Sequence, residues 1–149
     1  MAPALADRSL PPADDHAARF ARQREADRTS LTEDYVELIA DLLREEGEAR
    51  VVDVARRMGV SHPTVVATVA RLVREGLVET RPYRSLFLTE KGAEVASAAK
   101  ARHDLVVRFL LAIGLDRPTA EADAEGLEHH VSQATLDAFA RVLTEKEGR

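Results

Sequence analysis

The chain has 149 residues and a formal net charge of −5 at pH 7, and its length favours one domain or two very small ones. Hydrophobic residues make up 45% and charged residues 32% of it, which is a globular mixture and excludes a fibrous or wholly disordered chain. The absence of cysteine excludes disulfides, thiolate metal sites and cysteine nucleophiles. Because the longest apolar run has five residues, Phe109 to Ile113, and the N-terminus lacks an apolar signal core, we expect neither a standard secretory signal nor a membrane-spanning segment.

The charge is unevenly distributed along the chain. Residues 1–50 carry 7 basic and 12 acidic side chains, residues 51–92 carry 7 and 4, and residues 93–149 carry 7 and 10. A basic centre between acidic flanks suggests that a segment facing a polyanion is joined to one that concentrates carboxylates. The 25 alanines and an aromatic content of 4% favour a mainly α fold, because alanine is the best helix former.

The first predicted element is an N-terminal extension. Residues 1–12 contain three prolines and no periodic pattern, which predicts a disordered tail, and residues 16–28 form a basic stretch that is a candidate helix. The sequence Ser-Leu-Thr-Glu at 30–33 matches a capping box, and apolar residues then recur at helical spacing until Gly47. We therefore predict a helix over 31–46.

The remaining elements follow in chain order. Two short helices, at 51–58 and from Ser61 to about Glu75, are predicted on either side of a turn at Gly59. Strand-like runs at 77–80 and 86–88 flank a turn and predict a β-hairpin. Three further helices are predicted over residues 90–113, about 118–130 and 133–146.

The spacing between 51 and 76 is typical of a helix-turn-helix. Ala55, Gly59 and Val65 stand at i, i+4 and i+10, which suits a small residue at a helix crossing, a turn and a buried position on the second helix. The alternative is an ordinary helix pair with a β-ribbon used for packing. On the first interpretation the hairpin is a wing that touches phosphates. The predicted DNA-binding residues are Ser61, His62, Pro63, Thr64, Ala67, Thr68 and Arg71 on the second helix, and Arg81, Tyr83 and Arg84 on the wing.

A second constellation consists of carboxylates and histidines. The predicted helices carry two sets at helical spacing, Asp34 with Glu37 and Glu125 with Glu128 and His129. A further candidate ligand, His103, stands alone on its helix. Each set alone is better explained by a solvated helix face. If the helices converge, four carboxylates would repel one another and raise their pKa values, and a divalent cation would relieve this. Asp41 is a reserve ligand, and Gly126 suggests a close approach at this place.

The ligand types restrict the metal. Carboxylate oxygens and imidazoles without sulfur suit Mn²⁺, Fe²⁺ or Zn²⁺ and disfavour Cu(I) and iron–sulfur clusters. Because Zn²⁺ generally binds more tightly than Mn²⁺, selectivity for Mn²⁺ would have to come from coordination number and geometry.

With both constellations in view, residues 30–145 resemble the diphtheria toxin repressor family of metal-dependent transcription regulators, in its manganese transport regulator branch. The stretches that carry the resemblance are TEDYVELIADLL (32–43), VSHPTVVATVARLVREGLV (60–78), LFLTEKG (86–92), RHDLVVRFLLAIGL (102–115) and DAEGLEHHVSQATLDAF (123–139). The resemblance implies an N-terminal winged helix-turn-helix with a small β-hairpin wing, followed by a helical metal-binding and dimerisation domain. We expect an extension at 1–29, the DNA-binding domain at 30–92 and the helical domain at 93–149.

The resemblance also implies the site and the function. The six ligands would bind two Mn²⁺ per subunit, and the lack of cysteine together with Asp34, where iron-responsive members use other ligands, favours manganese over iron. The expected protein is a cytoplasmic homodimer that binds palindromic operators, represses manganese uptake genes and takes no small-molecule substrate. The apolar stripe Val106, Phe109, Leu110 and Ile113 suits either dimerisation or the intramolecular core.

Three alternatives stay open at this point. One is a winged-helix regulator that responds to Fe²⁺ or Zn²⁺, and another is one that responds to a non-metal ligand. The third is a ferritin-like di-metal enzyme, which would need paired Glu-x-x-His motifs that the sequence lacks, so we expect no enzyme. The N-terminal extension has two open roles, covering the dimer or touching DNA.

Overall fold

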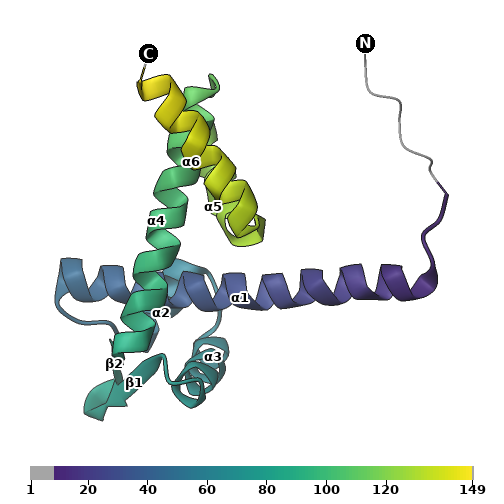
Figure 1. Ribbon diagram of the computed structural model, residues 1–149. Helices are drawn as coiled ribbons and strands as arrows, with labels where there is room; N and C mark the ends of the chain where they lie inside the picture. Colours follow the sequence, from purple (N-terminus) through teal and green to yellow (C-terminus); the bar gives the residue numbers. More distant parts are fainter. Residues whose placement is uncertain (1–8, 149) are drawn as a thin grey trace.

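The computed structural model describes residues 9–148 and is mainly helical, as predicted (Figure 1). The helices of this described part are α1 (Ala13–Glu46), α2 (Val51–Met58), α3 (His62–Arg74), α4 (Glu90–Ala112), α5 (Arg117–His130) and α6 (Gln133–Glu147), and the strands are β1 (Val78–Arg81) and β2 (Ser85–Leu88). Figure 1 shows α4 crossing α1, with the winged helix at one end of α4 and with α5 and α6 along its other half. None of the helices within residues 9–148 is both long and apolar enough to cross a membrane.

Helix α1 is longer than the sequence analysis predicts. The predicted start at residue 31 is wrong, because the helix runs without a break from Ala13. Residues 13–46 contain neither glycine nor proline, and their many alanines and arginines are good helix formers, so nothing ends the helix before Gly47. The capping-box residues therefore lie inside the helix. The N-terminal end of α1 extends away from the other elements (Figure 1), and most of the predicted tail, residues 1–8, lies outside the described residues.

The winged helix-turn-helix is present with nearly the predicted bounds. Gly59 adopts a left-handed conformation (φ 69°) between α2 and α3, and the Ser61 side chain accepts a hydrogen bond from the Thr64 backbone N–H. Strands β1 and β2 pair antiparallel, and a single turn of 3₁₀ helix joins them at the wing tip. The buried core of this domain consists of Tyr35, Val36, Ile39, Leu42, Ala49, Val51, Val54, Val65, Val69, Leu72, Leu77, Val78, Leu86 and Ala96.

A second core lies between α4, α5 and α6. Its buried members are Val106, Val107, Leu110, Ala120, Ala124 and Leu136, and the rings of Phe109 and Phe139 stack with centroids 3.8 Å apart. Three residues of the apolar stripe predicted on α4 thus pack in the intramolecular core, Val106 and Leu110 buried and Phe109 partly buried, whereas Ile113 is 51% exposed. Because Ala96 of α4 belongs to the first core, α4 connects the two parts of the molecule.

The start of α4 is tied to the segment that follows α3. Thr89 donates its backbone N–H to the carbonyl of Leu77 and its hydroxyl to the carbonyl of Gly76. One turn later, Gly92 lies so close to Leu77 that a Cβ at this position would overlap the Leu77 carbonyl oxygen. The backbone itself occupies this contact, so a side chain cannot be accommodated by a change of rotamer.

Gly92→Ala is therefore expected to lower the free energy of unfolding by about 3 kcal/mol, the upper range for overpacking a tight site. The measurement is urea unfolding followed by circular dichroism. Gly126→Ala is the matched control, since nothing lies within 4 Å of a Cβ there and the change removes the roughly 1 kcal/mol cost of a glycine inside a helix. Equal stability of Gly92→Ala and the wild type would contradict the packing described.

Candidate metal centre and nucleic-acid interface

The six predicted ligands lie together where α1, α4 and α5 meet. They form two groups, Asp34 with Glu37 and His129, and His103 with Glu125 and Glu128, and within each group the ligand atoms lie within 4.8 Å of one another. Helical spacing explains the arrangement, because residues three and four apart share one face of a helix. Helix α5 thus contributes to both groups, α1 to the first and α4 to the second.

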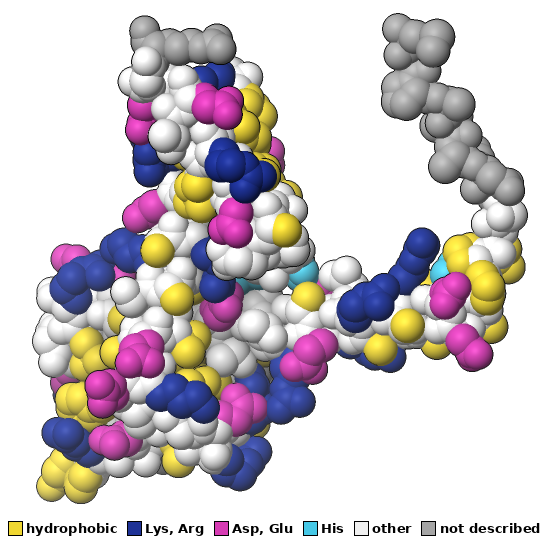
Figure 2. Space-filling model, in the orientation of Figure 1, with side chains coloured by type: hydrophobic (Ala, Val, Ile, Leu, Met, Phe, Trp, Pro, Cys, Tyr) yellow, Lys and Arg dark blue, Asp and Glu magenta, His cyan; other side chains and the backbone are white. Residues whose placement is uncertain are grey.

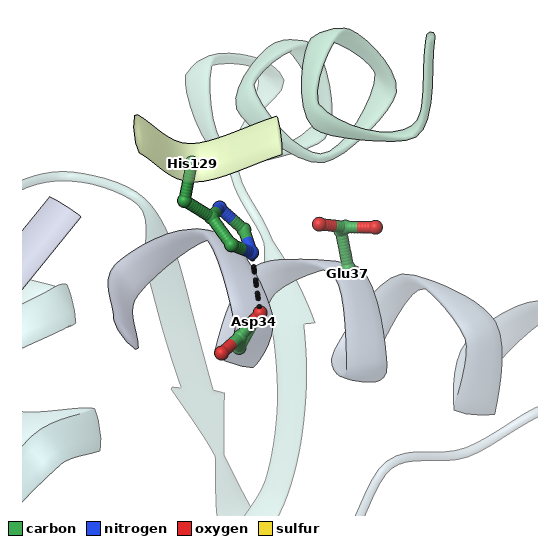
Figure 3. Close-up of side chains that lie close together, drawn as sticks. All are labelled: Asp34, Glu37 and His129. Atoms are coloured by element: carbon green, nitrogen blue, oxygen red, sulfur yellow. Dashed lines mark ion pairs between the residues drawn. The ribbon is translucent and has the colours of Figure 1, made fainter. Parts of the chain in front are cut away.

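The first group joins α1 to α5. The Nε2 atom of His129 lies 3.0 Å from Oδ1 of Asp34, and Figure 3 shows the ring directed from α5 towards Asp34, with Glu37 one turn further along α1. The side chain of His129 is 2% exposed and that of Asp34 is 40% exposed. The group therefore has a buried imidazole and at least one carboxylate that solvent can reach.

The second group joins α4 to α5 through Glu128. The Nδ1 atom of His103 lies 2.9 Å from Oε2 of Glu128 and 3.7 Å from Oε1 of Glu125. The other carboxylate oxygen of Glu128, Oε1, lies 3.1 Å from Nε2 of His129. Glu128 is therefore shared by the two groups, with one oxygen facing each imidazole.

Two buried atoms of this cluster lack hydrogen bonds. Oε2 of Glu128 and Nε2 of His129 make no hydrogen bond with any described residue, despite the short distances to their neighbours. A buried polar atom left unsatisfied costs roughly 1–3 kcal/mol, and such atoms require an explanation. Both are lone-pair donors of the kind that divalent metal ions accept. The residues present thus fit a metal ion.

Burial and repulsion by neighbouring carboxylates raise the pKa values of Asp34, Glu37 and Glu128. The pKa of Glu37 is raised to about 7, mainly by desolvation and then by the charge of Glu128. Desolvation also raises the pKa of Asp34 and of Glu128, with Glu125 adding to both shifts. A divalent cation would favour the ionised form of each group and reverse these shifts.

The two imidazoles have raised pKa values as well. Burial lowers the pKa of His129, but the hydrogen bond to Glu33 and the charges of Asp34 and Glu128 outweigh it. For His103 the hydrogen bond to Glu121 and the nearby carboxylates outweigh burial in the same way. The raised pKa values favour the protonated forms of both imidazoles, and bound protons offset part of the negative charge of the cluster.

Two glutamates at this site were missed by the sequence analysis. Glu33 lies 2.6 Å from Nδ1 of His129, and Glu121 lies 3.0 Å from Nε2 of His103. Spacing could have indicated both, since Glu33 stands four residues before Glu37 and Glu121 four before Glu125. The reserve ligand Asp41, in contrast, is exposed and paired with Arg44 at 2.8 Å, outside both groups. The close approach expected at Gly126 is not found, since no atom of another described element lies within 4 Å of a Cβ placed there.

The predicted DNA-binding residues lie mainly on one exposed face. Ser61, Pro63, Thr64 and Ala67 are exposed on α3, while His62 and Thr68 are partly exposed. On the wing, Tyr83 is 95% exposed, Arg81 lies over the Phe87 ring with 4.1 Å between its guanidinium carbon and the ring centroid, and the side chain of Arg84 lies outside the described part of the structure. Between α3 and the wing is a groove of about 1060 Å³ that includes Pro63, Ala67 and Tyr83 in its lining.

Arg71 does not share this face. Its guanidinium donates to the hydroxyl of Thr32 at 3.0 Å and to Glu75 at 3.1 Å, and its side chain is 21% exposed. Arg28 of α1 pairs with the same carboxylate at 3.1 Å. The structure thus places Arg71 in a contact between α3 and α1, and not among the residues of the groove.

These features define a class of protein, a winged-helix DNA-binding domain joined to a helical domain with a cluster of metal-ligand residues. The iron dependent repressor N-terminal DNA binding domain matches residues 27–86, and the metal binding and dimerisation domain of the same family matches residues 89–147. The chain belongs to this family, the metal-dependent, DNA-binding transcriptional regulators of the diphtheria toxin repressor type, and to the branch that contains the MntR regulators. The resemblance seen in the sequence is confirmed.

Individual relatives agree with this assignment. The transcriptional regulator MntR of Escherichia coli O6:H1 (strain CFT073) is 51% identical over 135 residues, 91% of this chain and 86% of that protein. The HTH-type transcriptional regulator MntR of Bacillus subtilis (strain 168) is 38% identical over 115 residues, 77% of this chain and 81% of that protein. A solved structure of a manganese-dependent transcriptional repressor in complex with manganese is 28% identical with a TM-score of 0.68, over 76% of this chain and 52% of the other. The chain spans about half the length of that structure.

The metal-free protein is expected to become less stable as the pH rises from about 5 to about 7.5. The pKa of Glu37 is 4.5 in a model peptide and about 7 in the fold, so between these values the folded protein binds more protons than the unfolded chain and the free energy of unfolding falls with pH. The raised pKa values of His103 and His129 act in the same direction, because the stability gained from a protonated imidazole is lost as it deprotonates.

Urea unfolding in EDTA at a series of pH values measures this slope. Glu37→Gln removes one of the titrating groups and should flatten the profile, whereas Glu45→Gln, an exposed residue of the same helix, should leave it unchanged. A profile that rises with pH, or an equal slope in Glu37→Gln and the wild type, would show that Glu37 does not carry the shifted pKa.

Proposed function

We propose that the protein is a Mn²⁺-responsive repressor of manganese uptake genes, which binds palindromic operators as a metal-loaded homodimer. The observation that carries this proposal is the pair of ligand groups sharing Glu128 at the junction of α1, α4 and α5. The MntR relatives and the manganese complex of a structural neighbour support the choice of metal and of function. In this proposal residues 30–92 bind DNA, residues 93–149 dimerise, residues 1–29 are an extension, and no catalytic step is assigned.

The site would hold two Mn²⁺ per subunit, one at each group. Asp34, Glu37 and His129 would hold one ion, His103 and Glu125 the other, and Glu128 offers one oxygen to each. The ligands are carboxylate oxygens and imidazole nitrogens without sulfur, a set that suits Mn²⁺. A divalent cation bound here supplies the positive charge that offsets the repulsion among the four carboxylates.

The position of the ligands suggests how the signal reaches DNA. Asp34 and Glu37 lie on α1, whose neighbouring residues Tyr35 and Val36 belong to the core of the winged helix. Glu125, Glu128 and His129 lie on α5, which belongs to the second core. When these side chains are held together, α1 is fixed against α5, and so is the DNA-binding domain against the dimerisation domain. In a homodimer this sets the spacing of the two recognition helices, which has to match the two half-sites of an operator.

The DNA-facing surface fits this role. The exposed first turns of α3 carry hydroxyl groups at Ser61 and Thr64, suited to phosphates and base edges. The middle segment of the chain, residues 51–92, is its basic part, and a basic segment in an acidic protein favours contact with a polyanion. Such a regulator would work in the cytoplasm, where the chromosome is accessible.

The proposal is tested by fluorescence anisotropy with a labelled DNA fragment from the region upstream of the gene. Protein is titrated at fixed salt in EDTA, and then with Mn²⁺, Mg²⁺, Zn²⁺ or anaerobic Fe²⁺. Mn²⁺ is expected to raise DNA affinity by roughly 10–100-fold, in the usual range of allosteric coupling. Glu128→Ala should remove the effect because both groups lose a ligand, and Glu94→Ala, exposed on α4, should retain it. DNA binding that no metal changes would contradict the proposal.

Tyr83 offers a separate test of the wing. It is 95% exposed and has a positive φ of 67°, a conformation that strains a residue with a side chain by roughly 1 kcal/mol. Tyr83→Gly should leave the free energy of unfolding equal or slightly higher, while it lowers affinity for operator DNA by about threefold or more through the lost contact. Tyr83→Phe separates the contribution of the hydroxyl from that of the ring. Unchanged DNA affinity in Tyr83→Gly would mean that the ring makes no contact with DNA.

A further inference from the structure

The nitrogen of His129 that points away from the ligand cluster has its own partner. Its Nδ1 lies 2.6 Å from Oε2 of Glu33, and the guanidinium of Arg102 lies 2.5 Å from the same oxygen. The Glu33 side chain is 10% exposed and the Arg102 side chain 27% exposed. These residues come from α1, α4 and α5, so Glu33 connects all three helices that form the site.

This contact determines which nitrogen of His129 carries the proton. A neutral imidazole has one N–H donor and one lone pair. A carboxylate only accepts hydrogen bonds, so Nδ1 of His129 must carry the proton and donate it to Glu33. The lone pair is then left on Nε2, the atom that faces Asp34 and Glu128. In a free histidine side chain the proton favours Nε2, and without Glu33 the ring would therefore direct an N–H at the position a metal ion needs.

We propose that Glu33 is a positioning residue of the metal centre, which fixes the tautomer and the orientation of His129 and is itself held by Arg102. The inference rests on the proposed metal site and adds to it a residue that is not a ligand. Carboxylates that accept the second N–H of a metal-bound histidine typically raise metal affinity 10–100-fold.

His103 provides an internal comparison. Its Nε2 lies 3.0 Å from Glu121, which Arg117 contacts at 3.2 Å, so the pattern of histidine, glutamate and arginine is repeated. Two differences make Glu121 less important. Its side chain is 46% exposed, which weakens the hydrogen bond by competition with water, and it holds the proton on Nε2, where the free side chain already favours it.

The first measurement is ¹⁵N NMR of the histidine rings in the metal-free protein, at a pH high enough to keep them neutral. The ring signals of His129 are identified as those that disappear in the variant His129→Asn. The wild type and Glu33→Gln should show the proton of His129 on Nδ1, since the amide oxygen of Gln can still accept it. Glu33→Ala should shift the proton towards Nε2. This readout distinguishes positioning from a general effect on folding.

The second measurement is Mn²⁺ affinity, by electron paramagnetic resonance of the free ion. Glu33→Ala should bind Mn²⁺ about 10–100-fold more weakly than the wild type, Glu33→Gln should be closer to the wild type, and Glu121→Ala should lose less than Glu33→Ala. Glu45→Ala, exposed on the same helix, is the control.

The outcomes separate this inference from the proposed function. A wild type that binds no Mn²⁺ contradicts the proposed function and this inference with it. A wild type that binds Mn²⁺ but carries the proton of His129 on Nε2, or equal affinity in Glu33→Ala, overturns the role of Glu33 and leaves the function standing. If Glu33→Ala does not fold, the wild type and Glu33→Gln decide: the proton on Nδ1 in both supports the inference, and the proton on Nε2 in either overturns it.

Discussion

The side chain of Glu128 is 2% exposed, and its carboxylate lies between two imidazoles. Three further carboxylates belong to the same cluster. A buried charge of this kind is costly unless it is paired and fully hydrogen-bonded, and one of its oxygens makes no hydrogen bond. A bound proton or a bound cation can neutralise this buried charge. One oxygen of Glu128 faces His103 of α4, and the other faces His129 of its own helix, which in turn faces Asp34 of α1. The neutralising proton or cation therefore belongs where the three helices meet.

Two long helices, α1 and α4, connect this cluster to the cores of the molecule. Helix α1 contains the candidate ligands Asp34 and Glu37, core residues of the winged helix and Thr32, which accepts a hydrogen bond from Arg71 of α3. Helix α4 contributes to both cores and carries His103. Helices α1 and α4 cross (Figure 1), and the cluster joins α5 to both of them. Over the face seen in Figure 2, acidic and basic side chains are interspersed on the body of the molecule.

The candidate metal ligands can be predicted from the sequence because each pair or triplet of them follows the period of a single helix. Asp34 with Glu37, and Glu125 with Glu128 and His129, can be read from local spacing, and the turn at Gly59 likewise marks the helix-turn-helix. Glu33 was missed because its partner His129 is 96 residues away, and no local pattern states which face of α1 meets α5. For Arg71, helical spacing shows that the side chain is not in the core, but it does not show the hydrogen bonds to Thr32 and Glu75. The start of α1 was wrong because a capping box inside a run of good helix formers need not end the preceding helix.

In the proposed metal centre, six side chains hold two metal ions, and Glu128 is shared by the two ligand groups. A crystal structure of the Mn²⁺-loaded protein, with anomalous diffraction data on both sides of the manganese absorption edge, tests it most directly. We expect two anomalous peaks per chain, one beside Nε2 of His129 and one beside Nδ1 of His103, with an oxygen of Glu128 directed at each. A single peak, or peaks at residues outside the two groups, would contradict it.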